Sequence, residues 1–268
     1  FLQASLGGII PNDLIIIGAK TGQGKTGLST AIAKSVASAG HPVHYFALEA
    51  ERYEIERRIK YGLISEAYYA NGDPNRSPIS YTAWRMGKLD VLLGPLENQL
   101  EREFIKTCKN LHTLYRISGN FDYRALEKHI TKIIGKTKLI VIDHLHYIDT
   151  EEDENRDYKR VIKLCRDLVL KHSIPIIVVA HLRKTQGGGK SGAGLISTIE
   201  DFHGTSDVPK VATTCIMLSP AFDHAPPDDN KHWWPTYMSV VKSRLEGSRT
   251  RYTGMTYFDP HSNAYADY

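Results

Sequence analysis

The nine residues from Gly18 to Thr26 read Gly-Ala-Lys-Thr-Gly-Gln-Gly-Lys-Thr, a composition typical of a loop that binds phosphate. Glycines at positions 22 and 24 allow the backbone to approach an anion closely, so that N–H groups and a helix N-terminus face its oxygens. Lys25 would reach the β- and γ-phosphates of ATP, and the hydroxyl of Thr26 would bind Mg²⁺. The predicted nucleotide-binding residues are Ala19, Lys20, Thr21, Gly22, Gln23, Gly24, Lys25, Thr26 and Gly27.

The sequence on both sides of this loop decides how it is interpreted. The apolar run Leu14–Ile17 is typical of a strand covered on both faces, and Leu28, Ile32 and Val36 recur at helical spacing after the loop. Ala19 replaces the first glycine of the G-x-x-x-x-G-K-[ST] pattern, a small departure because alanine is the next smallest residue. A glycine-rich turn before a helix is the alternative, but the flanking strand and helix favour nucleotide binding.

Two carboxylates follow buried strands elsewhere in the chain. Glu49 ends the predicted strand Val43–Leu48, and Asp143 ends the apolar run Leu139–Ile142. The carboxyl ends of strands in an open α/β sheet form its ligand-binding edge. Asp143 would hold Mg²⁺ there through water, together with Thr26. Glu49 would orient and polarise the water that attacks the γ-phosphate. From its position alone, Glu49 is equally well read as a glutamate at a helix N-terminus.

A third strand end carries His181, after Ile176–Ala180. A side-chain donor at this edge would sense the γ-phosphate, and a structural histidine is the alternative. The segment 183–194 that follows is basic, glycine-rich and free of acidic residues. Such a segment fits a phosphodiester chain, although an ordinary mobile linker has the same composition. Its place at the ligand edge favours DNA, and the predicted DNA-binding residues are Arg183, Lys184 and Lys190.

The alternation of strands and helices predicts an α/β fold with a mostly parallel central sheet flanked by helices. Helices are predicted over Tyr123–Ile134 and Asn155–His172. Later strands that would form a C-terminal antiparallel extension of the sheet are predicted at Thr213–Leu218, Thr236–Val241 and Thr253–Phe258. We expect residues 1–268 to form one domain, with residues 68–88 as a surface insertion because several Gly and Pro residues there break regular structure.

Composition sets the broad class of the protein. Of its 268 residues, 41% are hydrophobic, enough for a substantial core, and no apolar stretch is long enough to span a bilayer. Cys108, Cys165 and Cys215 are widely spaced and odd in number, which argues for a reducing compartment and against a disulfide framework or a cysteine zinc site. The formal net charge of +4 is too small to indicate nucleic acid by itself. We therefore expect a soluble protein with no membrane partner.

Taken in order, these motifs resemble the C-terminal motor domain of DnaB-type replicative helicases, which have a RecA-like P-loop NTPase core. Order and spacing carry the resemblance rather than any single motif. The matching stretches are 8–14, 18–26, Phe46–Glu49, Leu139–Leu145, Asn155–Arg156, Ile174–Ile176 and Lys242–Arg244.

The resemblance implies a role for each matching residue. Glu49 would be the catalytic carboxylate and Asp143 the Mg²⁺ ligand. Lys242 and Arg244 would reach across a subunit interface to the γ-phosphate held by a neighbour, with Arg244 as the arginine finger. The catalytic set is then Glu49, Lys25, Arg244, Lys242 and His181. The resemblance also implies a homo-oligomer, hexameric in the family, that uses ATP and Mg²⁺, acts on single-stranded DNA, and meets primase or a helicase loader.

The sequence also departs from the family. His181 and His146 stand where bacterial members carry glutamine, so sensing of the γ-phosphate would depend on pH. The N-terminal domain through which the family contacts primase has no counterpart in these residues. We expect a divergent member, viral or plasmid-borne, in the cytoplasm or in the replication compartment of the host.

Two other functions stay open at this point. One is a RecA-like ATPase without unwinding activity, of the recombination-accessory or clock-protein type. The other is a nucleotide-gated assembly or loader module, which has little need of both Glu49 and Arg244. The basic segment 183–194 favours the helicase motor over both.

Overall fold

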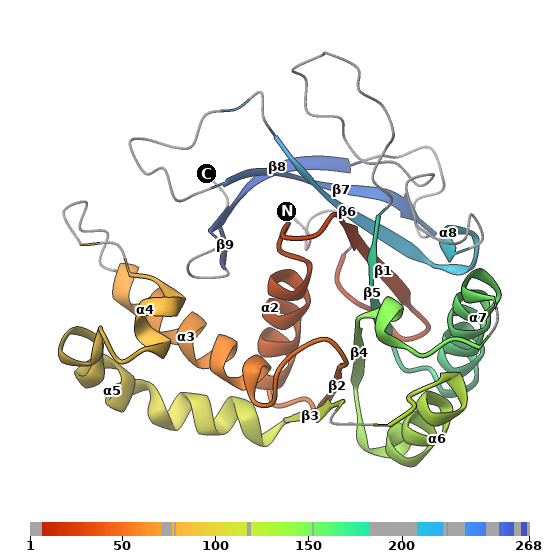
Figure 1. Cartoon of the computed structure of the whole chain (residues 1–268), viewed down its shortest axis with the longest axis horizontal. Coiled ribbons are helices and arrows are strands. Elements are labelled where there is room, and N and C mark those ends of the chain that lie inside the picture. Colours follow the sequence, from red (N-terminus) through yellow and green to blue (C-terminus); the bar gives the residue numbers. More distant parts are fainter. Residues whose placement is uncertain are drawn as a thin grey trace.

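The computed structural model describes residues 7–70, 77, 79–116, 119–151, 153–182, 208–221, 224, 234–244, 252–259 and 264–266. A nine-stranded sheet of order β3-β2-β4-β5-β1-β6-β7-β8-β9 runs through this part of the chain (Figure 1). The parallel strands are β1 (Leu14–Ala19), β2 (Val43–Ala47), β3 (Leu111–Tyr115), β4 (Leu139–Asp143), β5 (Ile176–His181) and β6 (Thr214–Pro220). The antiparallel strands are β7 (Trp234–Ser243), β8 (Tyr252–Asp259) and β9 (Ala264–Ala266). The predicted α/β fold with a C-terminal antiparallel extension is confirmed.

Helices cover the parallel part of the sheet on both faces (Figure 1). They are α2 (Lys25–Ser38), α3 (Glu54–Tyr69), α4 (Tyr81–Arg85), α5 (Asp90–Lys109), α6 (Tyr123–Ile133), α7 (Glu154–His172) and α8 (Val208–Val211). Two 3-10 helices, η1 (Ile134–Lys136) and η2 (Leu145–Tyr147), follow α6 and β4.

The central strand β1 shows why the sheet is buried on both faces. Leu14 and Ile16 join one core cluster with α6 and α7, whereas Ile15, Ile17 and Ala19 join a second cluster with α2 and α3. Successive side chains of a strand point to opposite faces, so an unbroken apolar run supplies both cores. Every residue of β1 is buried, which fixes the loop that follows it.

The helix predicted over Asn155–His172 is confirmed as α7, and an apolar stripe along it packs against the sheet. Val161, Cys165, Leu168 and Val169 are at most 8% exposed and belong to the core cluster on that face, with Leu164 packed against it. Asp153 caps the helix by accepting a hydrogen bond from the N–H of Arg156. The cap fixes where the helix begins, and the stripe holds one of its faces against the sheet.

The prediction of irregular structure over residues 68–88 was wrong for residues 81–85, which form α4. Ser80 caps this helix by accepting a hydrogen bond from the N–H of Ala83. Tyr81 and Trp84 pack beside the buried Tyr61 of α3, with ring centroids 5.5 and 5.4 Å from it. Aromatic packing on α3 therefore accompanies a short helix at residues 81–85, inside a stretch that was expected to be irregular.

Two further expectations concern the rest of the chain. The basic segment 183–194 lies outside the described residues. Among the described helices, none is both long and apolar enough to cross a membrane.

Candidate nucleotide-binding site

The carboxyl ends of four parallel strands meet at one edge of the sheet and bring the predicted residues together. Ala19 at the end of β1 lies beside His181 at the end of β5, and Ala47 at the end of β2 lies beside Asp143 at the end of β4. Glu49 follows two residues after Ala47. The strand order therefore places residues from four distant parts of the sequence around one point.

The loop between β1 and α2 has the backbone that the glycines were expected to allow. Gly22 and Gly24 have φ angles of 79° and 76°, in the left-handed region that favours glycine. Lys25 begins α2 and is only 6% exposed. Its Nζ donates to the carbonyl of Lys20 at 3.1 Å and lies 3.1 Å from Nδ1 of His181. Burial lowers the pKa of Lys25 to about 8, although Glu49 and Asp143 act in the opposite direction.

The far end of the loop is covered by the antiparallel extension. The hydroxyl of Tyr265 donates to the carbonyl of Gly24 at 3.0 Å, and the ring of Phe258 lies 4.9 Å from the Tyr265 ring. A Cβ atom at Gly24 would collide with both aromatic side chains. Position 24 thus requires glycine because its φ angle is positive and because no side chain fits between the loop and the two aromatic rings.

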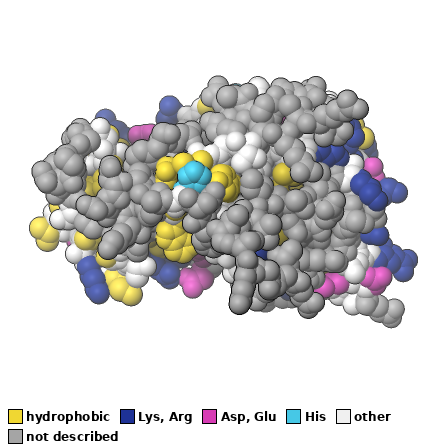
Figure 2. All heavy atoms as spheres, turned by 90° about the horizontal axis from the view of Figure 1, so that it is seen from above, with side chains coloured by type: hydrophobic (Ala, Val, Ile, Leu, Met, Phe, Trp, Pro, Cys, Tyr) yellow, Lys and Arg dark blue, Asp and Glu magenta, His cyan; other side chains and the backbone are white. Residues whose placement is uncertain are grey.

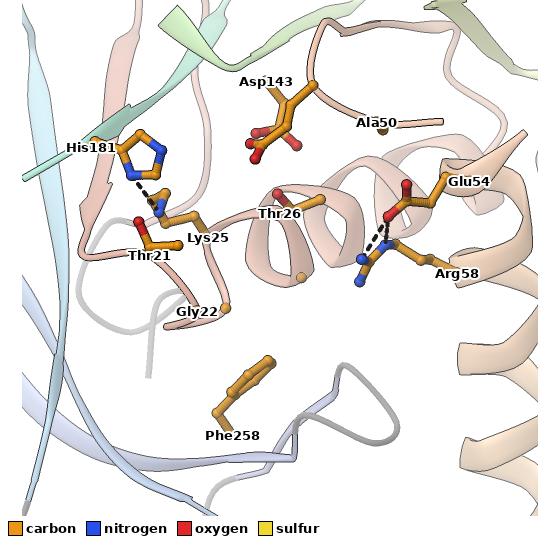
Figure 3. A pocket seen from close by; sticks show the side chains of 13 residues that line it. Thr21, Gly22, Lys25, Thr26, Ala50, Glu54, Arg58, Asp143, His181 and Phe258 are labelled. Atoms are coloured by element: carbon orange, nitrogen blue, oxygen red, sulfur yellow. Dashed lines mark hydrogen bonds and ion pairs between the residues drawn. The ribbon is translucent and has the colours of Figure 1, made fainter. Parts of the chain in front are cut away.

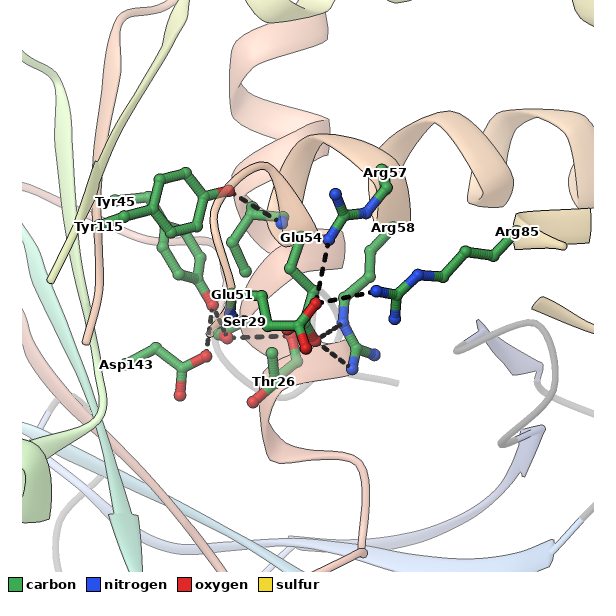
Figure 4. A network of polar contacts seen from close by, with 11 residues as sticks. Thr26, Ser29, Tyr45, Glu51, Glu54, Arg57, Arg58, Arg85, Tyr115 and Asp143 are labelled. Carbon is green, nitrogen blue, oxygen red and sulfur yellow. Dashed lines mark hydrogen bonds and ion pairs between the residues drawn. The ribbon is translucent and has the colours of Figure 1, made fainter. Parts of the chain in front are cut away.

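Asp143 lies on the other side of the loop in a buried hydrogen-bond network (Figure 4). The hydroxyl of Tyr45 donates to Oδ2 of Asp143 at 2.8 Å and lies 2.7 Å from Oγ of Ser29. Oδ1 of Asp143 is buried and has no hydrogen-bond partner within the described residues, while the side chain of Thr26 lies beside this carboxylate (Figure 3). Burial raises the pKa of Asp143, and the hydrogen bond from Tyr45 opposes that rise.

This arrangement fits a divalent cation. A buried carboxylate oxygen without a partner is costly unless a cation or donor meets it. An aspartate and a hydroxyl are oxygen donors of the kind Mg²⁺ prefers, and the adjacent loop supplies the place for phosphate oxygens. Asp143 and Thr26 are the residues that would hold the ion.

Glu49 reaches toward the same space from the end of β2. Its Oε2 lies 2.9 Å from Nε2 of His144, and its Oε1 accepts a hydrogen bond from the Tyr147 hydroxyl at 3.4 Å. The hydrogen bond from His144 is the largest of the influences that lower the pKa of Glu49, while burial acts against it. The side chain is 45% exposed, so the carboxylate also meets solvent.

These groups line one open pocket of about 390 Å³ (Figure 3). Its lining includes Lys25, Asp143, Glu49 and His181, and Phe258 lies beside the loop at Gly24. The outer wall comes from α3, where Arg58 and Glu54 form an ion pair of 2.7 Å. The pocket therefore combines a cationic floor, two carboxylates and an aromatic wall.

Lys242 and Arg244 lie elsewhere. Strand β7 runs antiparallel to β6, so Lys242 pairs with Cys215 near the start of β6, level with the amino end of β1. The length of β1, roughly 20 Å for a six-residue strand, separates this edge from the pocket. Burial lowers the pKa of Lys242, and the neighbouring cations Arg244 and Arg166 lower it further.

Basic side chains are concentrated near this distant edge. Lys242 donates to the carbonyl of Lys210 in α8, and Arg166 of α7 donates to the carbonyl of Asn12. Seen from above, several Lys and Arg side chains gather at the end of the molecule that carries α7 and α8 (Figure 2). Arg244 is exposed there and held through its backbone N–H, which donates to the carbonyl of Thr213.

Several residues of the site could not be identified from the sequence. His144 falls within a matching stretch but had no predicted role, and Tyr45, Tyr147 and Tyr265 had none either. All four touch predicted residues. No periodicity marks these contacts. The predicted DNA-binding residues Arg183, Lys184 and Lys190 lie outside the described part of the chain.

Comparisons with known proteins agree with this architecture. The fold is similar to that of a DnaB-like replicative helicase, whose structure was described together with its interactions with primase. The TM-score is 0.75, the identity is 13%, and the match covers 97% of this chain. The chain spans 58% of the length of that helicase. It is also similar to the ATPase domain of G40P, with a TM-score of 0.69, 14% identity and coverage of 97% of this chain and 86% of that one.

Sequence comparison gives a more specific result. No curated protein matches the chain significantly. The family model for the DnaB-like helicase C terminal domain matches residues 1–201, which include the loop, both carboxylates and His181. The chain therefore belongs to the DnaB-like helicase C-terminal domain family.

Proposed function

We propose that this chain is the ATP-hydrolysing motor of a replicative DNA helicase, with residues 1–268 forming one motor domain. It would assemble into a homo-oligomeric ring, a hexamer as the resemblance to the family implies. The ring would move along single-stranded DNA and unwind duplex. The observation that carries the proposal is the convergence of Lys25, Asp143 and Glu49 on one pocket beside a glycine loop.

ATP would lie with its phosphates over the loop. The N–H groups of residues 22–26 and the ammonium of Lys25 would bind the phosphate oxygens, since Gly22, Gly24 and Lys25 line the pocket. Bound Mg²⁺, held by Asp143 and Thr26, would neutralise charge on the β- and γ-phosphates. The Glu49 carboxylate would accept a hydrogen bond from the attacking water and orient it toward the γ-phosphate. His181, 3.1 Å from Lys25, would report whether the γ-phosphate is present.

The position of Lys242 and Arg244 supports a site shared between subunits. Both lie at the sheet edge opposite the pocket of their own chain, so they are placed to serve another copy. Arg244 is exposed, as a residue that enters a neighbouring site must be. In that site its guanidinium would stabilise the charge that develops on the γ-phosphoryl group during transfer.

The coupling to DNA rests on the sequence that follows the pocket. Arg183 and Lys184 follow β5 after a single intervening residue, Leu182. A change at the γ-phosphate would therefore pass along a short stretch of backbone to the predicted DNA-binding segment 183–194. Binding through Lys190 and its neighbours would rest on phosphate charge and be largely independent of base sequence. Primase or a helicase loader would be further partners.

The test is steady-state ATP hydrolysis with and without single-stranded DNA, using Glu49→Gln as the inactive control. We expect DNA to raise the rate of the native protein and Glu49→Gln to abolish hydrolysis in both conditions. Hydrolysis that depends on Glu49 but ignores DNA at low salt would support a RecA-like ATPase without unwinding activity. Equal rates for the native protein and Glu49→Gln would contradict the assignment of the site.

A further inference from the structure

Each ring nitrogen of His144 faces a polar group, and the contact at Nδ1 fixes the position of the ring proton. Nδ1 accepts the backbone N–H of His146 at 3.2 Å and so caps the short helix η2. An imidazole nitrogen that accepts a hydrogen bond carries a lone pair, so in the neutral ring the proton resides on the other nitrogen. That nitrogen, Nε2, lies 2.9 Å from Oε2 of Glu49, in a close contact that lacks the alignment of a regular hydrogen bond. The protonated side of the ring therefore lies against this carboxylate.

The ring has little freedom to turn away. His144 is 1% exposed, and three aromatic rings surround it at centroid distances of 4.2 Å for His181, 4.9 Å for Tyr147 and 5.6 Å for His146. Rotation about its side-chain bonds would break the cap on η2 as well as the contact with Glu49. A rigid imidazole thus lies against a carboxylate that is itself 45% exposed.

We propose that His144 is a positioning residue for hydrolysis: it fixes Oε2 of Glu49 and leaves Oε1 directed at the attacking water. This inference rests on the proposed function, because it assigns Glu49 the role of orienting that water. The Tyr147 hydroxyl, 3.4 Å from Oε1, limits the remaining swing of the carboxylate. The loss of water orientation lowers the rate of the chemical step without affecting the loop that binds the nucleotide.

The same cluster raises the question of a metal ion. One ligand atom each from Glu49, His144 and His181 lie within 4.8 Å of one another. A metal would need the lone pair of His144 Nε2, but this nitrogen carries the proton as long as Nδ1 accepts from His146. The ammonium of Lys25, 3.1 Å from His181, adds positive charge at the same place. The position of the ring proton favours direct contact with Glu49 over metal binding, and zinc binding becomes an outcome of the test.

The experiment compares three variants in the full chain. His144→Gln places a carboxamide nitrogen where it can still donate to Glu49, whereas His144→Asn keeps a short polar group that can cap η2 but does not reach Glu49. His144→Ala removes both functions. We expect His144→Gln to retain kcat within about threefold, and the other two to lose at least about tenfold with KM and the Kd for ATP unchanged within about twofold. Equal losses for Gln and Asn, or a native kcat in Asn, would overturn the proposal.

A second measurement does not depend on hydrolysis. ¹⁵N NMR of the histidine-labelled protein reports which ring nitrogen of His144 carries the proton, and we expect Nε2. A proton on Nδ1 would overturn the proposal. Binding of added Zn²⁺ alone that disappears in both His144→Ala and Glu49→Gln would also overturn it, in favour of a metal site. If the native protein does not hydrolyse ATP, the proposed function fails, while the NMR result still decides whether His144 holds Glu49.

Discussion

The ammonium nitrogen of Lys25 lies 3.1 Å from Nδ1 of His181, so the cation of the loop contacts the neighbouring strand end. A second contact, to the carbonyl of Lys20, holds it inside the loop. Neither partner is a carboxylate, so neither compensates the cost of burying a charge as a carboxylate contact would. A bound phosphate would supply the missing negative charge.

Nucleotide affinity should therefore fall at high pH. The pKa of Lys25 is lowered to about 8, chiefly by burial, so raising the pH above 8 neutralises the amine in the empty site. Phosphate binds the charged form, and the Kd for Mg²⁺-ADP should rise above pH 8 with a slope approaching tenfold per pH unit. Lys25→Arg keeps its charge at these pH values and serves as the control. A Kd for the native protein that stays constant from pH 7.5 to 9.5 would contradict the prediction.

Gly24 should not tolerate a side chain. Gly24→Ala would place an L-residue at a φ of 76° and drive its Cβ into Tyr265 and Phe258, at a cost of at least about 1–2 kcal/mol in unfolding free energy. We expect nucleotide affinity to fall at least about tenfold. The control is Gly62→Ala in α3, where no atom lies near the new Cβ and helix propensity improves by up to about 1 kcal/mol. Urea unfolding and nucleotide titration of both variants measure these effects, and equal behaviour of the two would refute the account of the loop.

Tyr45 should support the Mg²⁺ site from behind. Tyr45→Phe removes the donor to Oδ2 of Asp143 and leaves buried Ser29 with one partner fewer, which should cost about 1–3 kcal/mol of unfolding free energy. The Mg²⁺ concentration for half-maximal hydrolysis should rise at least about threefold, because Asp143 is less well held. Tyr158→Phe, which removes a hydroxyl bonded to Glu154 in α7, is the matched control and should leave the Mg²⁺ requirement unchanged. Identical Mg²⁺ curves for native protein and Tyr45→Phe would count against the site.

The sequence allowed the fold and the centre of the site to be predicted for a common reason. Parallel strands present their carboxyl ends at one edge, so a polar residue after each apolar run converges with the others. The contacts made by His144 and Tyr265 could not be predicted, since each joins segments far apart in the sequence. Their side chains follow no periodicity and have no fixed spacing from the residues they touch.

Helix α5 shows where local signals mislead. It contains Gly94 and Pro95, a pair that indicates a turn, yet the helix runs unbroken from Asp90 to Lys109. Leu93 is fully buried against α3, and Lys60 of α3 forms ion pairs with two glutamates of α5. Packing on a neighbouring helix therefore overrides the local preference of the sequence.

The central claim is that each hydrolytic site is shared, with Glu49 on one subunit and Arg244 on the next. The most direct measurement is ATP hydrolysis by mixtures of Glu49→Gln and Arg244→Ala, each of which should be inactive alone. In a mixed ring, an interface between an Arg244→Ala subunit that binds ATP and a Glu49→Gln neighbour contains both native residues. We predict hydrolysis that appears only in the mixture, reaching at most about a quarter of the native rate for random assembly in which interfaces act independently. Affinity co-purification of differently tagged variants shows whether mixed oligomers form. If they form but stay as inactive as either variant alone, the claim is contradicted.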